Sequence, residues 1–458
     1  MNKKKDQSVF STMTKSFMGV SLAAMVMTGA VTSSLATAHD DDFAPAAAVA
    51  QDVVLNPQYQ SNIEQIKSQP KVQAALQYAQ DISDKSLAQL IELTEIPAPP
   101  FKEEKRAARY AEMLKEAGAD KVWMDEVGNV IALREGTVGA ETVAMVAHLD
   151  TVFPEGTDVT VREVDGKLYA PGIGDDTRGL VMQLAVLDAI ESQGVETEDH
   201  VLFIGSVGEE GLGDLRGVKH LFREGGPKID TFIAVDGGDL SRLVYGGIGS
   251  YRYRVTFKGP GGHSWGAFGL ANPHHALGRA MRLLAENGPS VTSVGPKSSF
   301  SVGRIGGGTS INSIPFESWM EVDMRSGAPA RLDAIDAVFK AAMQQALEEE
   351  NAARQHGPAL TVDVDQVGLR PAGLSDPNGS LVQHMMAALK SYGVEPSLAV
   401  SSTDSNVPIS LGIPAITISR GGKGGRGHAP DEWWQDVDAY KAVQVGLLTL
   451  LAETKVAQ

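Results

Sequence analysis

Two adjacent carboxylates, Glu209 and Glu210, follow a stretch of apolar residues in the segment "VLFIGSVGEE", which spans 201–210. The apolar stretch is typical of a buried parallel strand, so both acidic side chains are expected at the carboxyl end of that strand. Burying two like charges there costs free energy unless a cation lies between them or the two groups have different tasks. The pair therefore indicates a site for a positive ion, for proton transfer, or for both.

Other side chains that can ligate a metal follow the other apolar strands. In open α/β sheets, ligands bind beyond the carboxyl ends of the strands, so the residues directly after each apolar segment are the candidates. They are His148, Asp150, Asp175, Asp176, Asp236 and His428. Taken singly, a strand-end aspartate or a lone histidine is more often a capping or structural residue. Together, imidazoles and carboxylates without a thiolate favour zinc, with cobalt or manganese as alternatives.

The elements that must position these residues form two patterns. After a helical region over 56–117, near-continuous apolar strands alternate with helices, which predicts a mostly parallel sheet flanked by helices on both faces. Between residues 248 and 367 the order becomes β-α-β-β-α-β, which is the ferredoxin-like arrangement. Because the α/β pattern returns over 368–458, we expect a catalytic domain of 56–247 and 368–458 with an inserted α+β domain of 248–367.

Six short segments then carry a resemblance to a known family. They are "HLDTV", "PGIGDDTRG", "GEEGLG", "VDGG", "GPGGHS" and "GHAPDE", in this order. This ordered set, within about residues 85–455, resembles the co-catalytic zinc exopeptidase and deacylase family. Its members include peptidase T, bacterial glutamate carboxypeptidase, succinyl-diaminopimelate desuccinylase, acetylornithine deacetylase and aminoacylase. The resemblance implies a zinc-exopeptidase catalytic domain with an inserted dimerisation domain.

The resemblance also implies roles for the candidate residues. Asp175 would bridge two divalent metal ions, with zinc as the first expectation and cobalt or manganese as alternatives. His148 and Asp236 would complete the shell of one ion, and Glu210 and His428 that of the other. Asp150 would hold the His148 imidazole in its ligating tautomer. Glu209 would accept a proton from the attacking water, whose pKa the metal lowers towards ~7, and deliver it to the leaving amine. One departure is Thr177, where many relatives have a lysine.

Three residues of the inserted domain match further positions of the family. The resemblance implies that His263 holds the oxyanion or carbonyl, that Asn312 binds substrate, and that Arg325 clamps a substrate carboxylate. Without the resemblance, Arg325 would be interpreted as a surface strand arginine paired with Asp323. The family's inserted domains pair through a two-fold interface, which implies a homodimer in which His263 acts in the partner's site.

The implied reaction is hydrolysis of an amide bond, and the preferred interpretation is an exopeptidase acting on small peptides. An N-acyl amino acid deacylase or a carboxypeptidase would use the same residues, and an inactive peptide-binding protein is the remote alternative. The sequence does not assign a role to two further loops. Residues 401–408 resemble a Thr-Asp loop of the family, and 421–427 are interpreted as a flexible loop. Beside that loop, Arg420, Lys423 and Arg426 are candidates for contacts to anionic groups.

The amino-terminal residues predict export. Residues 1–38 have a basic start, a short apolar segment and an "ATA" exit at 36–38, the layout of a secretory signal peptide, with an uncleaved anchor as the alternative. Residues 39–55 are interpreted as a flexible leader. The formal charge is −17, and because residues 1–38 contribute four lysines and one aspartate, the remaining chain carries −20. This charge argues against nucleic acid as a partner and, after cleavage, no membrane contact is expected.

Overall fold

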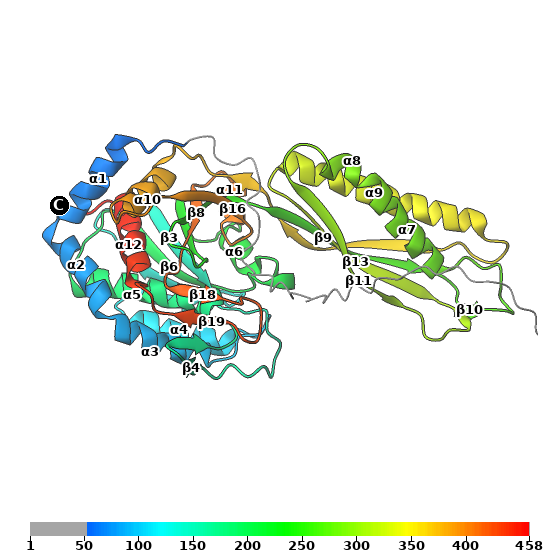
Figure 1. Ribbon diagram of the computed structural model, residues 1–458, viewed down its shortest axis with the longest axis horizontal. Helices are drawn as coiled ribbons and strands as arrows, with labels where there is room; N and C mark the ends of the chain where they lie inside the picture. The colour runs from blue at the N-terminus through cyan, green and yellow to red at the C-terminus, as the bar shows by residue number, and fades with distance from the viewer. Residues whose placement is uncertain (1–52, 458) are drawn as a thin grey trace, which may run out of the picture. The chain divides into compact units, whose positions relative to one another are not determined.

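The computed structural model describes residues 53–457, and its largest element is a nine-stranded sheet. The strand order is β1-β2-β6-β3-β7-β17-β8-β15, with β16 beside β8 (Figure 1). The four central strands β6, β3, β7 and β17 are mutually parallel. The strands are β1 Lys121–Met124, β2 Val130–Arg134, β3 Thr142–His148, β6 His200–Ser206, β7 Thr231–Val235, β8 Arg242–Gly247, β15 Gly373–Leu374, β16 Ser397–Ser401 and β17 Ala415–Ile418.

Helices cover both faces of this sheet, as predicted. Successive side chains of β3 point to opposite faces: Met145 packs into the core formed by one layer of helices, and Ala144 and Val146 pack into the core on the other face. The first layer contains α1 Pro57–Ser68, α2 Pro70–Asp81, α3 Ser83–Thr94, α4 Glu104–Glu116, α5 Gly179–Ser192, α10 Ser380–Lys390 and α12 Tyr440–Thr454. The second contains α6 Arg216–Leu221 and α11 Asn406–Ser410.

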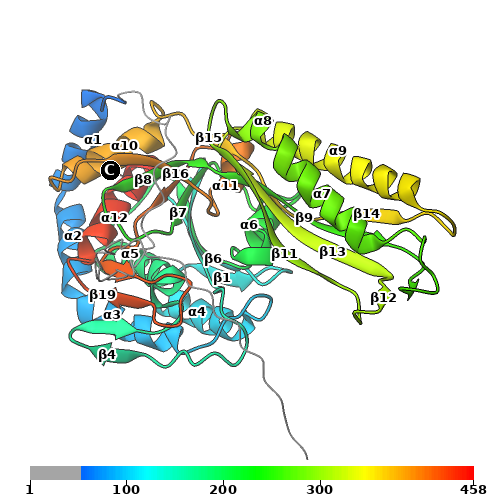
Figure 2. The ribbon, with the colours of Figure 1, turned by 45° about the vertical axis from the view of Figure 1, so that its right-hand side comes forward.

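Residues 249–370 form a second sheet with its own core. Its strands are β9 Gly249–Lys258, β11 Ser298–Gly307, β13 Glu317–Ser326 and β14 Thr361–Arg370, and its helices are α7 Pro273–Asn287, α8 Pro289–Thr292 and α9 Pro329–Ala353. The antiparallel order β11-β13-β9-β14 is that of a ferredoxin-like domain, with α7 and α9 on one face (Figures 1 and 2). Phe257 of β9 and Phe339 of α9 are fully buried in the core that this sheet forms with its helices. The predicted fold class is thereby confirmed, and β14 runs three residues past the expected boundary at residue 367.

Short strands complete the fold. They are β4 Arg162–Val164, β5 Lys167–Tyr169, β18 Lys423–Gly425 and β19 Trp433–Gln435 in one small sheet, and β10 Gly262–His263 with β12 Ser313–Ile314 in another. The single-turn elements are η1 Ile173–Arg178 and η2 Gly211–Gly213.

The first described residues are already packed. Val53 and Leu55 lie against the main core, and the backbone N–H of Asn56 donates to Gln383 Oε1 at 2.8 Å. Residues 53–55 therefore belong to the folded part rather than to the expected leader, because Val53 and Leu55 are partly buried against the core, although Val54 is exposed. The expected signal peptide over 1–38 and leader residues 39–52 lie outside the described residues. Within 53–457, no helix combines the length and the apolar character that crossing a membrane requires.

Candidate active site

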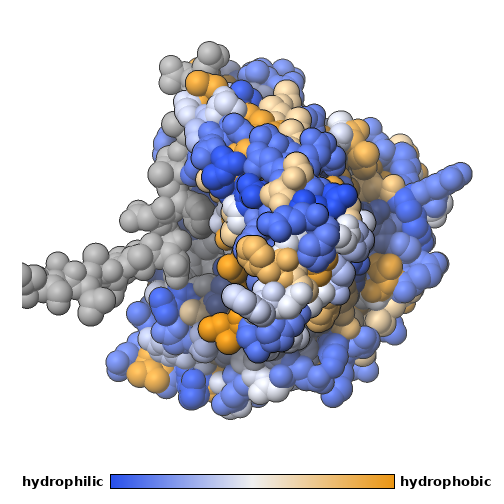
Figure 3. Space-filling model, turned by 90° about the vertical axis from the view of Figure 1, so that its right-hand side faces the viewer, coloured by the Kyte–Doolittle hydropathy of each residue, from blue (hydrophilic) through white to orange (hydrophobic). Residues whose placement is uncertain are grey.

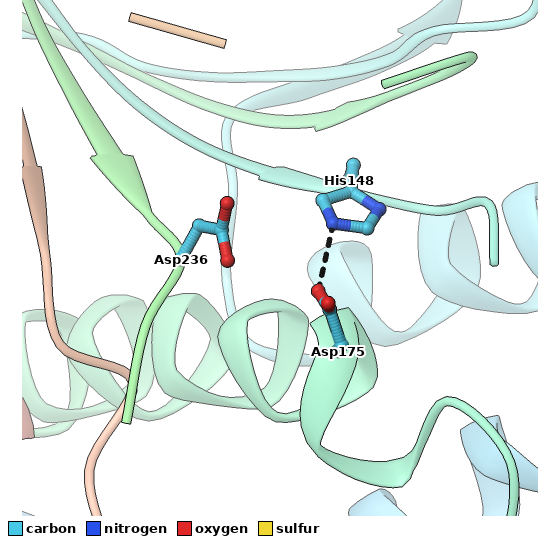
Figure 4. Close-up of side chains that lie close together, drawn as sticks. All are labelled: His148, Asp175 and Asp236. Atoms are coloured by element: carbon cyan, nitrogen blue, oxygen red, sulfur yellow. Dashed lines mark hydrogen bonds and ion pairs between the residues drawn. The ribbon is translucent and has the colours of Figure 1, made fainter. Parts of the chain in front are cut away.

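Three predicted ligands meet at the carboxyl edge of the parallel sheet. His148 is the last residue of β3, Asp236 directly follows β7, and Asp175 lies in the turn η1 that leads into α5. The three side chains point toward one another in Figure 4, and His148 Nε2 lies 3.1 Å from Asp175 Oδ1. One ligand atom from each residue lies within 4.8 Å of the others, so this group can hold a single cation.

Asp175 also belongs to a second group of possible ligands. Its Oδ2 atom lies 3.2 Å from His428 Nε2, which in turn lies 2.8 Å from Glu210 Oε1. Hydrogen bonds to Asp175 and Glu210 raise the pKa of His428 to about 11, so these carboxylates attract positive charge. Because Oδ1 faces His148 and Oδ2 faces His428, Asp175 occupies the position that a bridging ligand requires.

The donor set fits divalent metal ions. Three carboxylates and two imidazoles converge without a thiolate, which suits zinc, cobalt or manganese. His148 is 2% exposed, and Asp175, Glu210 and Asp236 are mostly shielded from water. Concentrating negative charge in a buried position is costly without cations, so these residues would hold one ion at His148, Asp175 and Asp236 and another at Asp175, Glu210 and His428.

A buried glutamate that the sequence analysis missed supports the Asp175 turn. Glu432 accepts hydrogen bonds from the backbone N–H groups of Gly172, Gly174 and Asp175 at 2.8 to 2.9 Å. Burial raises the pKa of Glu432 to about 7. Gly172 has φ 76°, which favours glycine, and a Cβ atom there would lie 2.5 Å from Thr151. The signal was present in the motif "GHAPDE", whose last residue is Glu432.

Asp150 differs from its predicted role. His148 Nδ1 lies 2.9 Å from the main-chain carbonyl oxygen of Asp150 but 3.7 Å from its Oδ1 atom. The carboxylate instead accepts the backbone N–H groups of Glu209 and Glu210 at 3.0 and 2.9 Å. Asp150 therefore orients the imidazole through its backbone, while its side chain fixes the segment that carries both glutamates.

Glu209 is held by an arginine that the sequence analysis did not identify. Arg370 Nη1 donates to Glu209 Oε1 at 2.8 Å, and Nη2 donates to the Glu209 carbonyl oxygen. Both side chains are less than one-tenth exposed. Burial raises the pKa of Glu209, and the facing Arg370 guanidinium opposes that rise. The Glu209 carboxylate also lies near the His148 imidazole and the Glu210 carboxylate, and the three could together hold a cation, but unlike the other two Glu209 is bonded to Arg370.

The inserted domain contacts the glutamate loop at two further points. Arg252 of β9 donates to the carbonyl oxygen of Gly211 at 2.5 Å, and the backbone N–H of Leu369 donates to Asp214 at 2.9 Å. Arg370 itself is the last residue of β14. The first and last strands of the inserted domain therefore hold residues 209–214 directly.

The loop over 401–408 now has a structural role. Asn406 Nδ2 donates at 2.9 Å to the carbonyl oxygens of Ile248 and Pro371, the residues that flank the inserted domain in the chain. Asp404 is buried, and its Oδ2 atom accepts from Ser206 Oγ at 2.5 Å. Burial raises the pKa of Asp404 to about 6. The loop thus joins both connections to the inserted domain.

The segment 421–427 does not match its interpretation as a flexible loop. Residues 423–425 form β18, which pairs with β19. Arg420 is not placed for a substrate anion, because its Nη1 atom lies 3.3 Å from Asp236 Oδ1 and 3.4 Å from Asp175 Oδ1. Lys423 is exposed, and Arg426 pairs with Asp431.

The three predicted residues of the inserted domain lie apart from these ligand groups. His263 and Asn312 are both exposed, and the β10–β12 pairing brings them together, with His263 opposite Ser313. No ligand group found within 53–457 includes either residue. Arg325 Nε donates to Asp323 Oδ2 at 2.7 Å, which is the surface pairing considered as its alternative.

Comparisons with known proteins agree with the fold. The family model "Peptidase family M20/M25/M40" matches residues 144–452. Over 303 residues the chain is 24% identical to the Bacillus subtilis protein YqjE, covering 64% of this chain and 76% of that protein. Aminopeptidase PepT from Bacillus cereus matches with a TM-score of 0.66 at 20% identity, covering 81% of this chain and 99% of that one. The di-peptidase Dug1p from Saccharomyces cerevisiae matches with a TM-score of 0.66 at 16% identity, and the match covers 84% of this chain and 99% of Dug1p.

The family match extends over more than half of the chain and includes every predicted metal ligand, which confirms the resemblance found in the sequence. The chain therefore belongs to the peptidase family M20/M25/M40 and is a metal-dependent hydrolase of peptide or amide bonds.

Proposed function

We propose that this protein is a secreted or periplasmic exopeptidase that cleaves small peptides at a pair of divalent metal ions, with Glu209 as general base. The observation that carries the proposal is the position of Asp175, whose two oxygens face two separate groups of ligands beside the buried Glu209. Zinc is the first expectation for both ions, and cobalt or manganese suits the same donors.

The residues of the chain divide binding from proton transfer. When bound, two divalent cations lower the pKa of water and stabilise negative charge on the substrate oxygen. Glu209 takes the proton of the attacking water and returns it to the leaving amine. Because Arg370 engages Oε1, we expect Oε2 to exchange the proton.

The substrate class rests on similarity of fold. Among solved structures of this fold are an aminopeptidase and a di-peptidase, and a hydantoinase/carbamoylase family amidase from Burkholderia vietnamiensis matches with a TM-score of 0.60 at 19% identity. An N-acyl amino acid deacylase and a carboxypeptidase therefore stay alternatives, since both break an amide bond. An inactive peptide-binding protein is disfavoured because all five ligands and Glu209 are in place.

A substrate screen with metal analysis tests the proposal. The full chain is assayed with matched di- and tripeptides that have free or blocked amino termini, N-acyl amino acids and C-terminal glutamate conjugates. Amino-acid release from unblocked peptides alone supports an aminopeptidase. Cleavage of only N-acyl amino acids identifies a deacylase, and release only from the carboxyl end identifies a carboxypeptidase. No turnover of any compound by fully metal-loaded protein contradicts the proposal.

We also propose a homodimer in which His263 completes the site of the partner subunit. Near His263 in the chain, Trp265 and Phe268 are 88% and 72% exposed, and Ile311, beside Asn312, is fully exposed. Figure 3 shows the side of the molecule that lies at the right in Figure 1, and apolar patches lie among hydrophilic residues on it. Exposed large apolar side chains of this kind favour a protein–protein contact.

Mixing two inactive variants tests this assembly. His263→Ala and Glu209→Gln should each be nearly inactive alone, and subunit exchange should restore activity, because a mixed dimer has one site with both His263 and Glu209 intact. Up to about a quarter of wild-type activity is expected if pairing is random, since half of the dimers are mixed and each has one working site of two. A fully active monomer in sedimentation, or an exchanged mixture without recovery, would show that His263 does not act in trans.

The secretion proposal has a direct measurement. The mature amino terminus should be His39, because the exit "ATA" at 36–38 ends there. Amino-terminal sequencing of the exported protein checks this, and recovery of the intact chain with membranes would favour an anchor.

A further inference from the structure

A buried arginine lies among the metal ligands. The Nη1 atom of Arg420 lies 3.3 Å from Asp236 Oδ1, 3.4 Å from Asp175 Oδ1 and 3.6 Å from Asp176 Oδ1, and the side chain is 15% exposed. Burial favours the neutral form of Arg420, but the facing carboxylates raise its pKa above the ordinary value, so the guanidinium keeps its charge.

The contacts of Arg420 are not shared equally between the two groups of ligands. Asp175 Oδ1, which Arg420 contacts, is the oxygen that faces His148, whereas Asp175 Oδ2 faces His428. Asp236, the second contact, belongs only to the group with His148. The positive charge of Arg420 therefore lies at the His148–Asp175–Asp236 group.

The group with Glu210 has a different electrostatic environment. Arg370, the guanidinium beside the glutamate pair, makes its hydrogen bonds to Glu209 and Ser402 rather than to Glu210. Glu210 Oε1 and Asp175 Oδ2 instead lie 2.8 and 3.2 Å from His428 Nε2, which is itself a ligand. The fixed positive charge of Arg420 lies instead at the other group, next to Asp236 Oδ1 and Asp175 Oδ1.

We propose that Arg420 makes the two metal positions unequal, so that a divalent ion binds tightly at Asp175–Glu210–His428 and weakly at His148–Asp175–Asp236. A fixed cation next to two ligand oxygens repels the incoming ion and competes for the same lone pairs. The second ion then binds only at a higher free metal concentration, and Arg420 sets that concentration. This inference rests on the two-metal centre of the proposed function.

Direct metal titration of the full chain tests the inference without a substrate. Chelator-treated wild-type protein, Arg420→Met and Arg420→Lys are titrated with Zn²⁺ by calorimetry, and bound zinc is counted by mass spectrometry after dialysis at defined free Zn²⁺. Wild type should show one tight and one weak step. Arg420→Met should tighten the weak step at least about tenfold, because one repulsive charge is removed from a buried position. Arg420→Lys keeps the charge and should retain the weak step.

Two controls locate the effect. Arg426→Gln removes an arginine from the same segment, one that is exposed and paired with Asp431, and should leave both steps unchanged. The single variant Asp236→Asn, in which Arg420 is unchanged, should lose the weak step and keep the tight one. This second measurement tests the assignment even if Arg420→Met does not fold.

The outcomes separate the inference from the proposed function. If Arg420→Met leaves the weak step unchanged or weakens it further, or if Asp236→Asn removes the tight step, the inference is wrong while the two-metal centre stands. If wild type and Arg420→Met both bind fewer than two Zn²⁺ ions, the two-metal centre is overturned and the inference with it.

Discussion

The Glu209→Gln variant is expected to keep its metal content and its fold while its kcat falls at least about a hundredfold, the usual scale for losing a positioned acid–base group. The physical reason is that glutamine preserves the shape of the side chain and can still accept a hydrogen bond from Arg370 Nη1, which donates to Glu209 Oε1 at 2.8 Å. An amide cannot take up the proton of the attacking water. The measurement combines kcat and KM on the best peptide of the screen with metal analysis and thermal unfolding.

Glu210→Gln is the matched control for this variant. It changes the neighbouring residue in the same way, but Glu210 Oε1 lies 2.8 Å from His428 Nε2 within a group of metal ligands. Its expected result is the reverse: metal content falls, and activity falls with it. Loss of metal in Glu209→Gln with full metal in Glu210→Gln would mean that the two glutamates have exchanged roles.

The Asp175→Asn variant is expected to lose one or both metal ions and essentially all activity. Asp175 offers one carboxylate oxygen to His148 and the other to His428, so a single substitution weakens both groups of ligands. Each ligand is a large share of a small coordination shell, and an amide is a poorer ligand than a carboxylate. Metal content by mass spectrometry after dialysis, together with activity at saturating Zn²⁺, measures the effect.

His428→Ala provides the comparison for Asp175→Asn. Because His428 belongs to one group of ligands only, its loss should weaken one metal position and spare the other. Full metal occupancy with normal turnover in either variant would contradict the site. A loss of two ions in Asp175→Asn and of one in His428→Ala would identify Asp175 as the shared ligand.

The sequence by itself determined the architecture and the ligand types. Apolar strands separated by helices have few stable arrangements, and residues that follow parallel strands must share one sheet edge, so the candidate ligands could be grouped before their distances were known. The choice of His148, Asp175, Glu210, Asp236 and His428 among them came from the resemblance to the family. The ordered motifs then identified the family. These features are local in the chain or follow from general rules of sheet topology, which explains why they could be predicted.

Only the tertiary structure decided which charges meet at the site. Arg370 lies 161 residues from Glu209, and Arg420 lies 184 residues from Asp236, so no spacing in the chain relates them. The role of Asp150 likewise depended on whether its carbonyl or its carboxylate faces His148, a matter of about an ångström. Such contacts arise from the packing of β14 and the segment after β17 against the sheet edge. These contacts decide which carboxylates face a positive charge, because electrostatic effects depend on distance and burial rather than on residue type alone.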